Sequence, residues 1–94
     1  MQIQHEASGH KGAFYIEENG ERLAEMIYTQ AGDSRIIINH TEVSEALRGK
    51  NAGKQLVAAS VEYARQHKLK ILPLCPFAKS VFDKVKEYED VLDK

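Results

Sequence analysis

Hydrophobic and polar residues alternate through the first half of the chain, which is the pattern of β-strands with one buried face. Phe14 and Ile16 share one face of the first clear strand, and Met26 and Tyr28 share a face of the next. The most strongly predicted strand contains the continuous β-branched run Ile36–Ile38. Four strands are therefore expected, over residues 2–5, 12–17, 22–30 and 35–43, the first of them weak.

Short turns join the later strands. The sequence Glu18-Asn19-Gly20-Glu21 suits a type I′ hairpin, because Asn and Gly both tolerate positive φ. Residues 31–34, with Gly32 at their centre, form a second turn. The first half of the chain is therefore predicted to be an antiparallel meander.

The second half has a different period. Leu56, Val57, Val61 and Ala64 recur at helical spacing, with small Ser60 on the same stripe, which predicts a helix from residue 53 to about residue 67. A short apolar strand follows over residues 69–74, and its proline indicates a sheet edge or a boundary.

A last helix is predicted to begin at Pro76, since proline suits the first helical position. Phe77, Val81, Val85 and Tyr88 would mark one of its faces. The strand that ends at residue 43, the long helix and the strand after it form a βαβ unit, whose right-handed crossover makes the two strands parallel. The predicted fold class is α+β, one domain over residues 1–94 with a meander followed by βαβα.

Composition narrows the function classes. The net charge of −1 gives no basic field for nucleic acid or an anionic membrane surface, and no apolar run approaches the roughly 20 residues of a membrane span. The single cysteine, Cys75, excludes an intramolecular disulfide. The first residues lack a cationic segment followed by an apolar one, so a signal peptide is not expected. We therefore expect a cytoplasmic location.

The segment between the third clear strand and the long helix has the chemistry of a phosphate site. Gly49, Ala52 and Gly53 are small enough for a ligand to approach the backbone, and Lys50 and Lys54 add positive charge. The first turn of a helix also has unpaired N–H groups and the positive end of the helix dipole. From the residues alone, a pyrophosphate site and an ordinary strand–helix loop both remain open.

The same segment resembles the cofactor motif of the GNAT superfamily of acyl-CoA N-acyltransferases. The family pattern, Arg/Gln-x-x-Gly-x-Gly/Ala, places Arg48 first and Gly53 last, with Asn51 at a position that is usually Gly. The segments 40–43 and 73–78 extend the resemblance to a small single-domain GNAT-like branch of about this length. The resemblance implies an acetyl-CoA-dependent N-acetyltransferase with a splayed pair of parallel strands.

The resemblance to the GNAT superfamily also implies where acetyl-CoA is held. Thr41 and Val43, on the strand before the loop, would bind the pantetheine arm. The pyrophosphate would lie on the loop formed by Arg48, Gly49, Lys50, Asn51, Ala52, Gly53 and Lys54.

The candidate catalytic residues follow from what amine acetylation requires. Many family members use a tyrosine on the last helix as the acid, but the aromatic residues of that helix here are Phe77 and Phe82. Cys75 is the alternative, since it would precede a helix N-terminus that favours a thiolate. It would donate a proton to the leaving thiolate, or carry the acetyl group itself, or simply be a buried small residue.

His40 and Glu42 are the candidate bases, because alternation places both on one face of their strand. Each could instead satisfy a local backbone group. We assign no metal ligand, and no role to His5 or His10.

Only residues 6–11 separate the first two strands, which is too short for the helices that close over the acceptor in typical family members. An open acceptor side favours a protein or peptide amine over a small metabolite, or a dimer partner that closes the site, and both a monomer and a homodimer remain open. Two other classes stay open: a non-catalytic module that binds CoA or acyl-CoA, and a structural domain that binds no cofactor.

Overall fold

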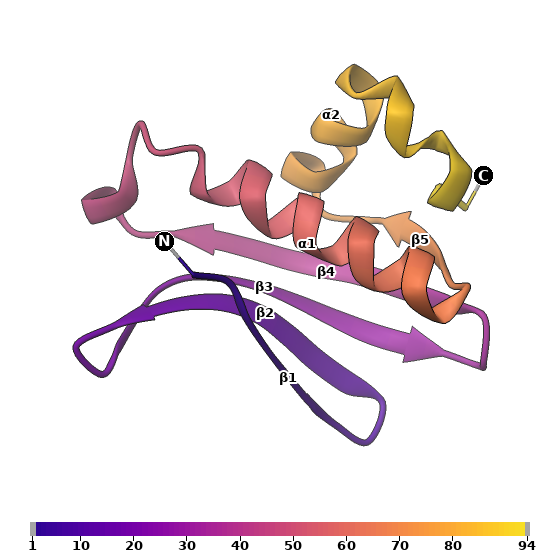
Figure 1. Ribbon diagram of the computed structural model, residues 1–94, viewed down its shortest axis with the longest axis horizontal. Coiled ribbons are helices and arrows are strands. Elements are labelled where there is room, and N and C mark those ends of the chain that lie inside the picture. The colour runs from indigo at the N-terminus through magenta and orange to yellow at the C-terminus, as the bar shows by residue number, and fades with distance from the viewer. Residues whose placement is uncertain (1, 94) are drawn as a thin grey trace.

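The computed structural model describes residues 2–93, which form one five-stranded sheet in the order β1-β2-β3-β4-β5 with helix α1 on one face (Figure 1). The first four strands are antiparallel neighbours, and the fifth runs parallel to the fourth. The strands are β1 (Gln4–Ser8), β2 (Lys11–Glu18), β3 (Glu21–Ala31), β4 (Arg35–Val43) and β5 (Lys70–Pro73). The helices are α1 (Ala52–His67) and α2 (Pro76–Lys84), with 3₁₀ helices η1 (Glu45–Leu47) and η2 (Lys86–Val91).

This is the predicted α+β fold, a meander followed by βαβα. The β2–β3 hairpin turns at Asn19 and Gly20, whose φ angles of 53° and 80° are both positive, as a type I′ turn requires. The first strand was predicted too early, at residues 2–5, because its pairing with β2 continues to Ser8 opposite Lys11.

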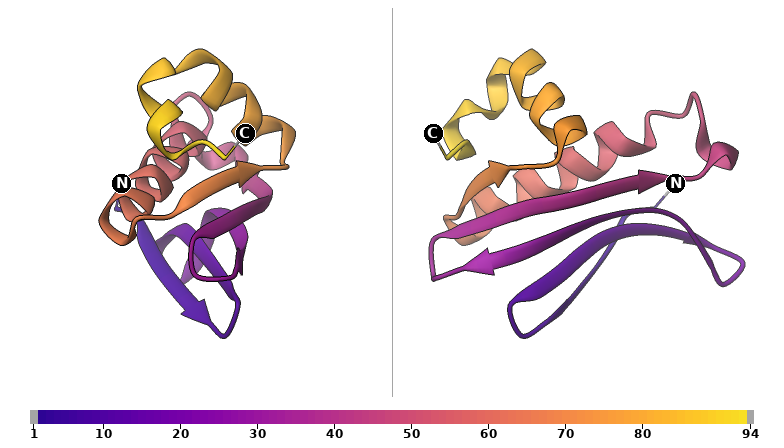
Figure 2. Two further views of the ribbon diagram at one scale, coloured as in Figure 1. Left: turned by 90° about the vertical axis from the view of Figure 1, so that its right-hand side faces the viewer. Right: turned by 180° about the vertical axis from the view of Figure 1, so that it is seen from behind.

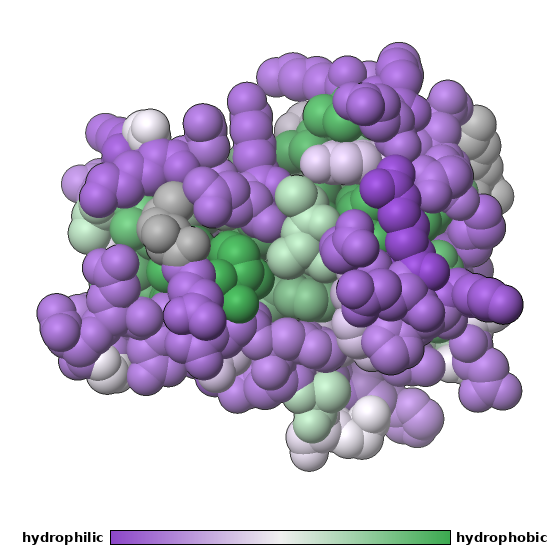
Figure 3. Space-filling view, in the orientation of Figure 1, coloured by the Kyte–Doolittle hydropathy of each residue, from purple (hydrophilic) through white to green (hydrophobic). Residues whose placement is uncertain are grey.

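The core lies between α1 and the face of the sheet turned toward it. Tyr28 and Ile36 are fully buried there, opposite Leu56 and Val61 of the predicted helical stripe. Ser60, the polar member of that stripe, is also buried and donates a 2.7 Å hydrogen bond to a backbone carbonyl one turn back. On the side of α1, Figure 3 shows mostly hydrophilic surface with hydrophobic residues near the middle. No helix in the described range is long and apolar enough to cross a membrane.

The two layers leave one face of the sheet open. Helix α2 and η2 pack beside α1 and against β5, where Leu92 bridges to Ile71. Seen from behind, strands β2 to β4 lie in front of α1 and no helix of the described residues covers them (Figure 2, right). This uncovered surface is called the open face below.

A β-bulge at Asn39 decides which side chains of β4 reach that face. His40 lies opposite Ile27 while Ile38 lies opposite Tyr28, so Asn39 is the extra residue. Simple alternation from Ile38 would direct His40 toward the core. The bulge turns it to the open face instead, and turns the residues on either side of Glu42 toward the helices.

The last helix is shorter than predicted. Helix α2 begins at Pro76 as expected but ends at Lys84, and Val85 adopts an extended conformation (φ −100°, ψ 91°). Val85 and Tyr88 therefore do not continue a face of α2, although both pack against the core from the 3₁₀ segment that follows. Phe77, placed on the same predicted face, is 38% exposed.

Candidate functional site

The loop between β4 and α1 is built on a short 3₁₀ turn. The Ser44 hydroxyl accepts a hydrogen bond from the backbone N–H of Ala46 (3.2 Å) and caps η1. Leu47 is buried, and its carbonyl accepts the backbone N–H of Lys50 (3.1 Å). The loop is therefore fixed at its base while its remaining residues face solvent.

Two left-handed residues turn the chain into α1. Gly49 has a φ of 80° and Asn51 a φ of 58°. Asn is among the few non-glycine residues that adopt this region readily, so it can stand where the family pattern has Gly. The Asn51 side chain makes no capping hydrogen bond. Its contribution is therefore conformational.

The N-terminus of α1 presents backbone donors in a basic setting. The first helical hydrogen bond runs from the N–H of Gln55 to the carbonyl of Asn51 (3.0 Å), so the N–H groups of the preceding first turn have no partner within the helix. The first turn holds no acidic residue, and Arg48, Lys50 and Lys54 are exposed around it. These donors and charges fit an anionic group such as pyrophosphate.

A cavity of about 260 Å³ opens over this loop. Of the seven loop residues singled out from the sequence, only Lys50 lies outside its lining. Three apolar residues complete the wall, and two of them, Phe77 and Val43, come from other elements. The lining consists of Val43, Leu47, Arg48, Gly49, Asn51, Ala52, Gly53, Lys54 and Phe77.

Strands β4 and β5 part beside the loop, as the resemblance implied. Their pairing ends at Ile38 opposite Pro73, and from there β4 continues to Val43 paired only with β3. The N–H groups of Leu74 and Cys75 both donate to the carbonyl of Ile38 (3.1 Å each), which turns the chain away from β4. A gap with one free strand edge results.

The backbone groups of Thr41 and Val43 face that gap. The N–H of Ser44 donates to the carbonyl of Leu23 (2.7 Å). Val43 and the residue opposite it, Ala24, therefore form a non-hydrogen-bonded pair of the antiparallel ladder. The N–H and carbonyl of Val43 therefore point away from β3, and those of Thr41, two residues earlier, do the same. Both lie beyond the last residue pair of β4 and β5.

Cys75 closes the inner end of the gap. It is the N-cap of α2, with Pro76 at the first helical position, and is 6% exposed. Its Sγ lies 3.3 Å from the Thr41 hydroxyl oxygen. Burial raises the pKa of the thiol, but the Thr41 hydroxyl and then the backbone N–H groups of Ala78, Phe77 and Thr41 lower it, and the net pKa is below its usual value.

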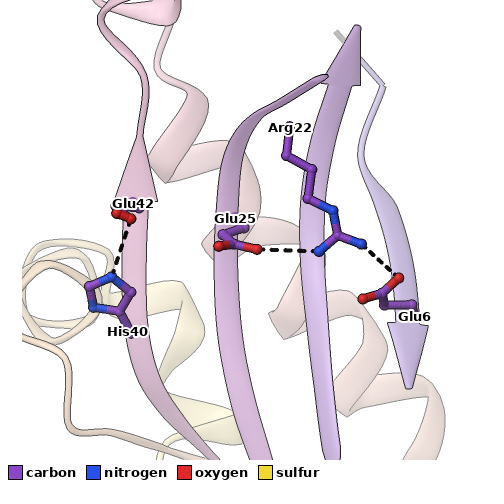
Figure 4. Close-up of polar contacts among 5 residues, drawn as sticks. All are labelled: Glu6, Arg22, Glu25, His40 and Glu42. Atoms are coloured by element: carbon purple, nitrogen blue, oxygen red, sulfur yellow. Dashed lines mark hydrogen bonds and ion pairs between the residues drawn. The ribbon is translucent and has the colours of Figure 1, made fainter. Parts of the chain in front are cut away.

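The two candidate bases lie together on the open face (Figure 4). His40 Nε2 is 3.7 Å from a carboxylate oxygen of Glu42, and both side chains are exposed. Thr41, between them in sequence, points to the helix side of the sheet, where it meets Cys75. The structure thus divides the predicted catalytic residues between the two faces of β4.

The sequence analysis missed an ion-pair row on the same face. Arg22 joins Glu25 of β3 (3.2 Å) to Glu6 of β1 (2.7 Å), with its guanidinium 3.8 Å from the centre of the Tyr15 ring (Figure 4). Glu25 lies directly opposite Glu42. Only the strand register, which the sequence does not state, brings these residues together.

A ring cluster at the other end of α1 was also missed. His5 stacks on Phe14 at 4.4 Å, and its Nε2 is 2.5 Å from the Tyr28 hydroxyl oxygen. Tyr63 of α1 contacts both His5 and Tyr28. Gly12 lies opposite Tyr28, where a Cβ would collide with the ring. A glycine within a predicted strand was therefore the one sequence feature that could have indicated this cluster.

The surroundings of His5 in this cluster lower its pKa and so favour the neutral imidazole. Burial against the rings is the main cause that lowers the pKa of His5, and the positive charge of His67 acts in the same direction. Glu6 acts against both. Burial likewise raises the pKa of Tyr28.

Together, the splayed strands and the loop at α1 match the architecture of N-acetyltransferase folds, and comparison with known proteins identifies the family. The sequence profile of the GCN5-related N-acetyl-transferase family matches residues 13–91. The chain belongs to this family, the GNAT acyltransferases.

Individual relatives agree with this assignment. A GCN5-like protein from Staphylococcus aureus, solved in solution, is 38% identical over 96% of this chain and 87% of its own, with a TM-score of 0.74. Protein NATD1 of Danio rerio is 29% identical over 80% of this chain and 67% of its own length. Tetrahymena GCN5 covers 82% of this chain and 51% of its own with a TM-score of 0.67, and its 15% identity supports the fold alone.

Proposed function

We propose that this chain is an acetyl-CoA-dependent N-acetyltransferase whose acceptor is an amine on a protein or peptide. Family membership supports the reaction class. The observation that supports acetyl-CoA as the donor is that two candidate binding elements, the N-terminus of α1 and the free edge of β4, adjoin one another. The unpartnered N–H groups of α1 lie beside the free edge of β4, and one cavity contains both Val43 and Gly53.

The roles of the donor-binding residues follow from this arrangement. The backbone of residues 49–54 and the charges of Arg48, Lys50 and Lys54 hold the pyrophosphate. The backbone of Val43 pairs with the amides of the pantetheine arm as a further strand would, and Thr41 continues the same edge. Bound acetyl-CoA supplies a thioester carbonyl that an amine can attack.

Cys75 lies at the end of this path. Its lowered pKa and its place at the N-terminus of α2 favour a thiolate. Two roles remain, one for each protonation state. The thiol would give its proton to the departing CoA sulfur. The thiolate would instead attack the thioester carbon, break its bond to the CoA sulfur, and later pass the acetyl group to the acceptor amine, which regenerates the thiolate. In both, Thr41 positions the sulfur through its hydroxyl group.

His40 and Glu42 are proposed to accept the proton of the acceptor amine. They flank Thr41 on the face that no helix of the described residues covers, so an amine approaching β4 from that side passes them first. Between β1 and β2 the described chain has only a turn at Gly9 and His10, which cannot close over a small substrate. The acceptor is therefore proposed to be large, or else the partner in a homodimer closes the site.

Thermal unfolding with acetyl-CoA tests the donor. A ligand at 100 times its dissociation constant adds about 2.7 kcal/mol, which raises the melting temperature of a domain of this size by more than about 10 °C. Lys54→Glu should remove this rise, and Lys86→Glu, on η2 and away from the loop, should retain it. A rise of equal size in both variants would contradict the proposed loop site.

Turnover tests the transfer. Lysine-containing peptides incubated with acetyl-CoA should release free CoA thiol and gain an acetyl group by mass spectrometry, faster than small amines do. Cys75→Ala should lose this activity while binding acetyl-CoA, and full activity in that variant would end both roles of Cys75. An acetyl group found on Cys75 in the absence of acceptor would select the covalent role.

A second candidate function is a non-catalytic CoA-binding module of the same fold. The aromatic residues of α2 are Phe77 and Phe82, neither of which can donate a proton. Tyr88, which lies in η2, packs edge-on against Phe82 with the two ring centres 5.8 Å apart. A thermal shift with acetyl-CoA that is accompanied by no thiol release from any acceptor would favour this function.

A further inference from the structure

The first observation concerns where large apolar side chains are exposed. Of the described residues, Val43 (40%), Leu74 (60%) and Phe77 (38%) are the exposed large hydrophobic ones. Val43 is the last residue of β4, Leu74 follows β5 and Phe77 is the second residue of α2, so all three lie beyond the last residue pair of the two parallel strands. Exposed apolar area so concentrated indicates a contact surface.

The second observation concerns Gly53. Its φ is not in the left-handed region, and it lies inside the first turn of α1, so the backbone conformation does not require glycine. A Cβ at this position would lie 2.6 Å from Cζ and 2.7 Å from Cε2 of the Phe77 ring. The absence of a side chain at Gly53 therefore provides the place in which the Phe77 ring lies.

The third observation is that the ring and the loop share one cavity. Phe77 and Val43 line the same 260 Å³ space as the unpaired N–H groups of α1. A ligand that runs from those donors to the free edge of β4 passes these two side chains. Its anionic part thus lies next to an apolar part.

We propose that Phe77, which packs over Gly53 and lines the same cavity as Val43, is a specificity-determining residue that recognises the branched aliphatic segment of CoA next to its pyrophosphate. This inference rests on the proposed function. In CoA, the carbon that carries two methyl groups is one methylene away from the pyrophosphate oxygen. A nucleotide diphosphate that lacks the pantetheine arm presents the same anion to the loop but nothing to the apolar pair. Phe77 thus lets the site prefer CoA to free nucleotides.

Calorimetry with two ligands tests the proposal without measuring turnover. One ligand is CoA and the other is its nucleotide half, adenosine 3′-phosphate 5′-diphosphate. Phe77→Ala should weaken CoA binding about tenfold, since a partly buried aromatic contact of this size contributes on the order of 1–2 kcal/mol. The same variant should change nucleotide binding less than about twofold. Phe77→Leu keeps an apolar contact and should lie between wild type and Phe77→Ala for CoA.

A double substitution separates the contribution of the Phe77 ring to ligand binding from that of the loop backbone at Gly53. Gly53→Ala should weaken both ligands, because its methyl group displaces the Phe77 ring into the cavity. Adding Phe77→Ala to Gly53→Ala should restore nucleotide binding but not CoA binding. Circular dichroism and melting temperature confirm that each variant is folded.

The outcomes distinguish failure of the Phe77 assignment from failure of the proposed function. Equal weakening of both ligands by Phe77→Ala and Phe77→Leu, or no effect on either ligand, would overturn the assignment of Phe77 while leaving the proposed function in place. A wild-type protein that binds neither ligand would overturn the proposed function, and this inference with it. Selective loss of CoA binding in Phe77→Ala supports both.

Discussion

The conformation of Asn51 makes a quantitative prediction about the loop. Its φ of 58° places it in the left-handed region, and its side chain makes no capping bond, so substitution mainly tests the backbone. Most L-residues lose about 1–2 kcal/mol in that region, and Asn loses less. Asn51→Ala is therefore expected to lower the free energy of unfolding by about 1 kcal/mol and the melting temperature by about 4–8 °C.

Asn51→Gly should behave differently. Glycine removes the strain, but the extra freedom of the unfolded chain offsets this gain, so its stability should stay within about 0.5 kcal/mol of wild type. The affinity for acetyl-CoA should fall in Asn51→Ala and stay unchanged in Asn51→Gly, because only alanine disfavours the turn that aims the N–H groups of α1.

Lys68 offers a matched control at the other end of α1. It has the same φ of 58°, at the C-cap, far from the loop. Lys68→Gly should raise the melting temperature and leave acetyl-CoA affinity unchanged. The reasoning is refuted if Asn51→Ala matches wild type in urea denaturation, or if Asn51→Gly weakens binding as much as Asn51→Ala does.

Three further predictions concern the thiol, the ring cluster and the core. Thr41→Val should raise the pKa of Cys75, the only cysteine, as followed by the ultraviolet absorbance of the thiolate; an unchanged pKa would show that the hydroxyl does not reach the sulfur. Because folding lowers the pKa of His5, the free energy of unfolding should fall as the pH drops below about 6.5, and His5→Gln should reduce that fall in urea titrations at two pH values. Equal pH dependence in both proteins would contradict the role of His5. Leu56→Ala, at a fully buried position, should cost about 2–5 kcal/mol in the same assay, and a cost below about 1 kcal/mol would contradict the packing described for α1.

The sequence predicted the fold where local signals and tertiary packing agree. The β-branched run Ile36–Ile38 lies in β4, and the apolar stripe from Leu56 to Ala64 is buried in α1. Asn51 adopts the positive φ that its place in the motif requires. Each of these depends on residues close together in the chain.

The features that the sequence could not predict depend on strand register. The bulge at Asn39 moves His40 to the open face, and the pattern of hydrophobic and polar residues in β4 does not predict this bulge. The contact of His5 with Tyr28 joins strands that are not neighbours in the sheet. The break at Val85 interrupts a regular apolar spacing, and nothing in the neighbouring residues explains it.

The loop before α1 and the free edge of β4 are proposed to bind acetyl-CoA together. Amide chemical shifts during a titration with acetyl-CoA test this claim most directly. The largest changes are expected at Val43 and Gly49, and at Gly53 in the first turn of α1, with little change at β1. Changes confined to the open face around Arg22, or none at saturating acetyl-CoA, would contradict it.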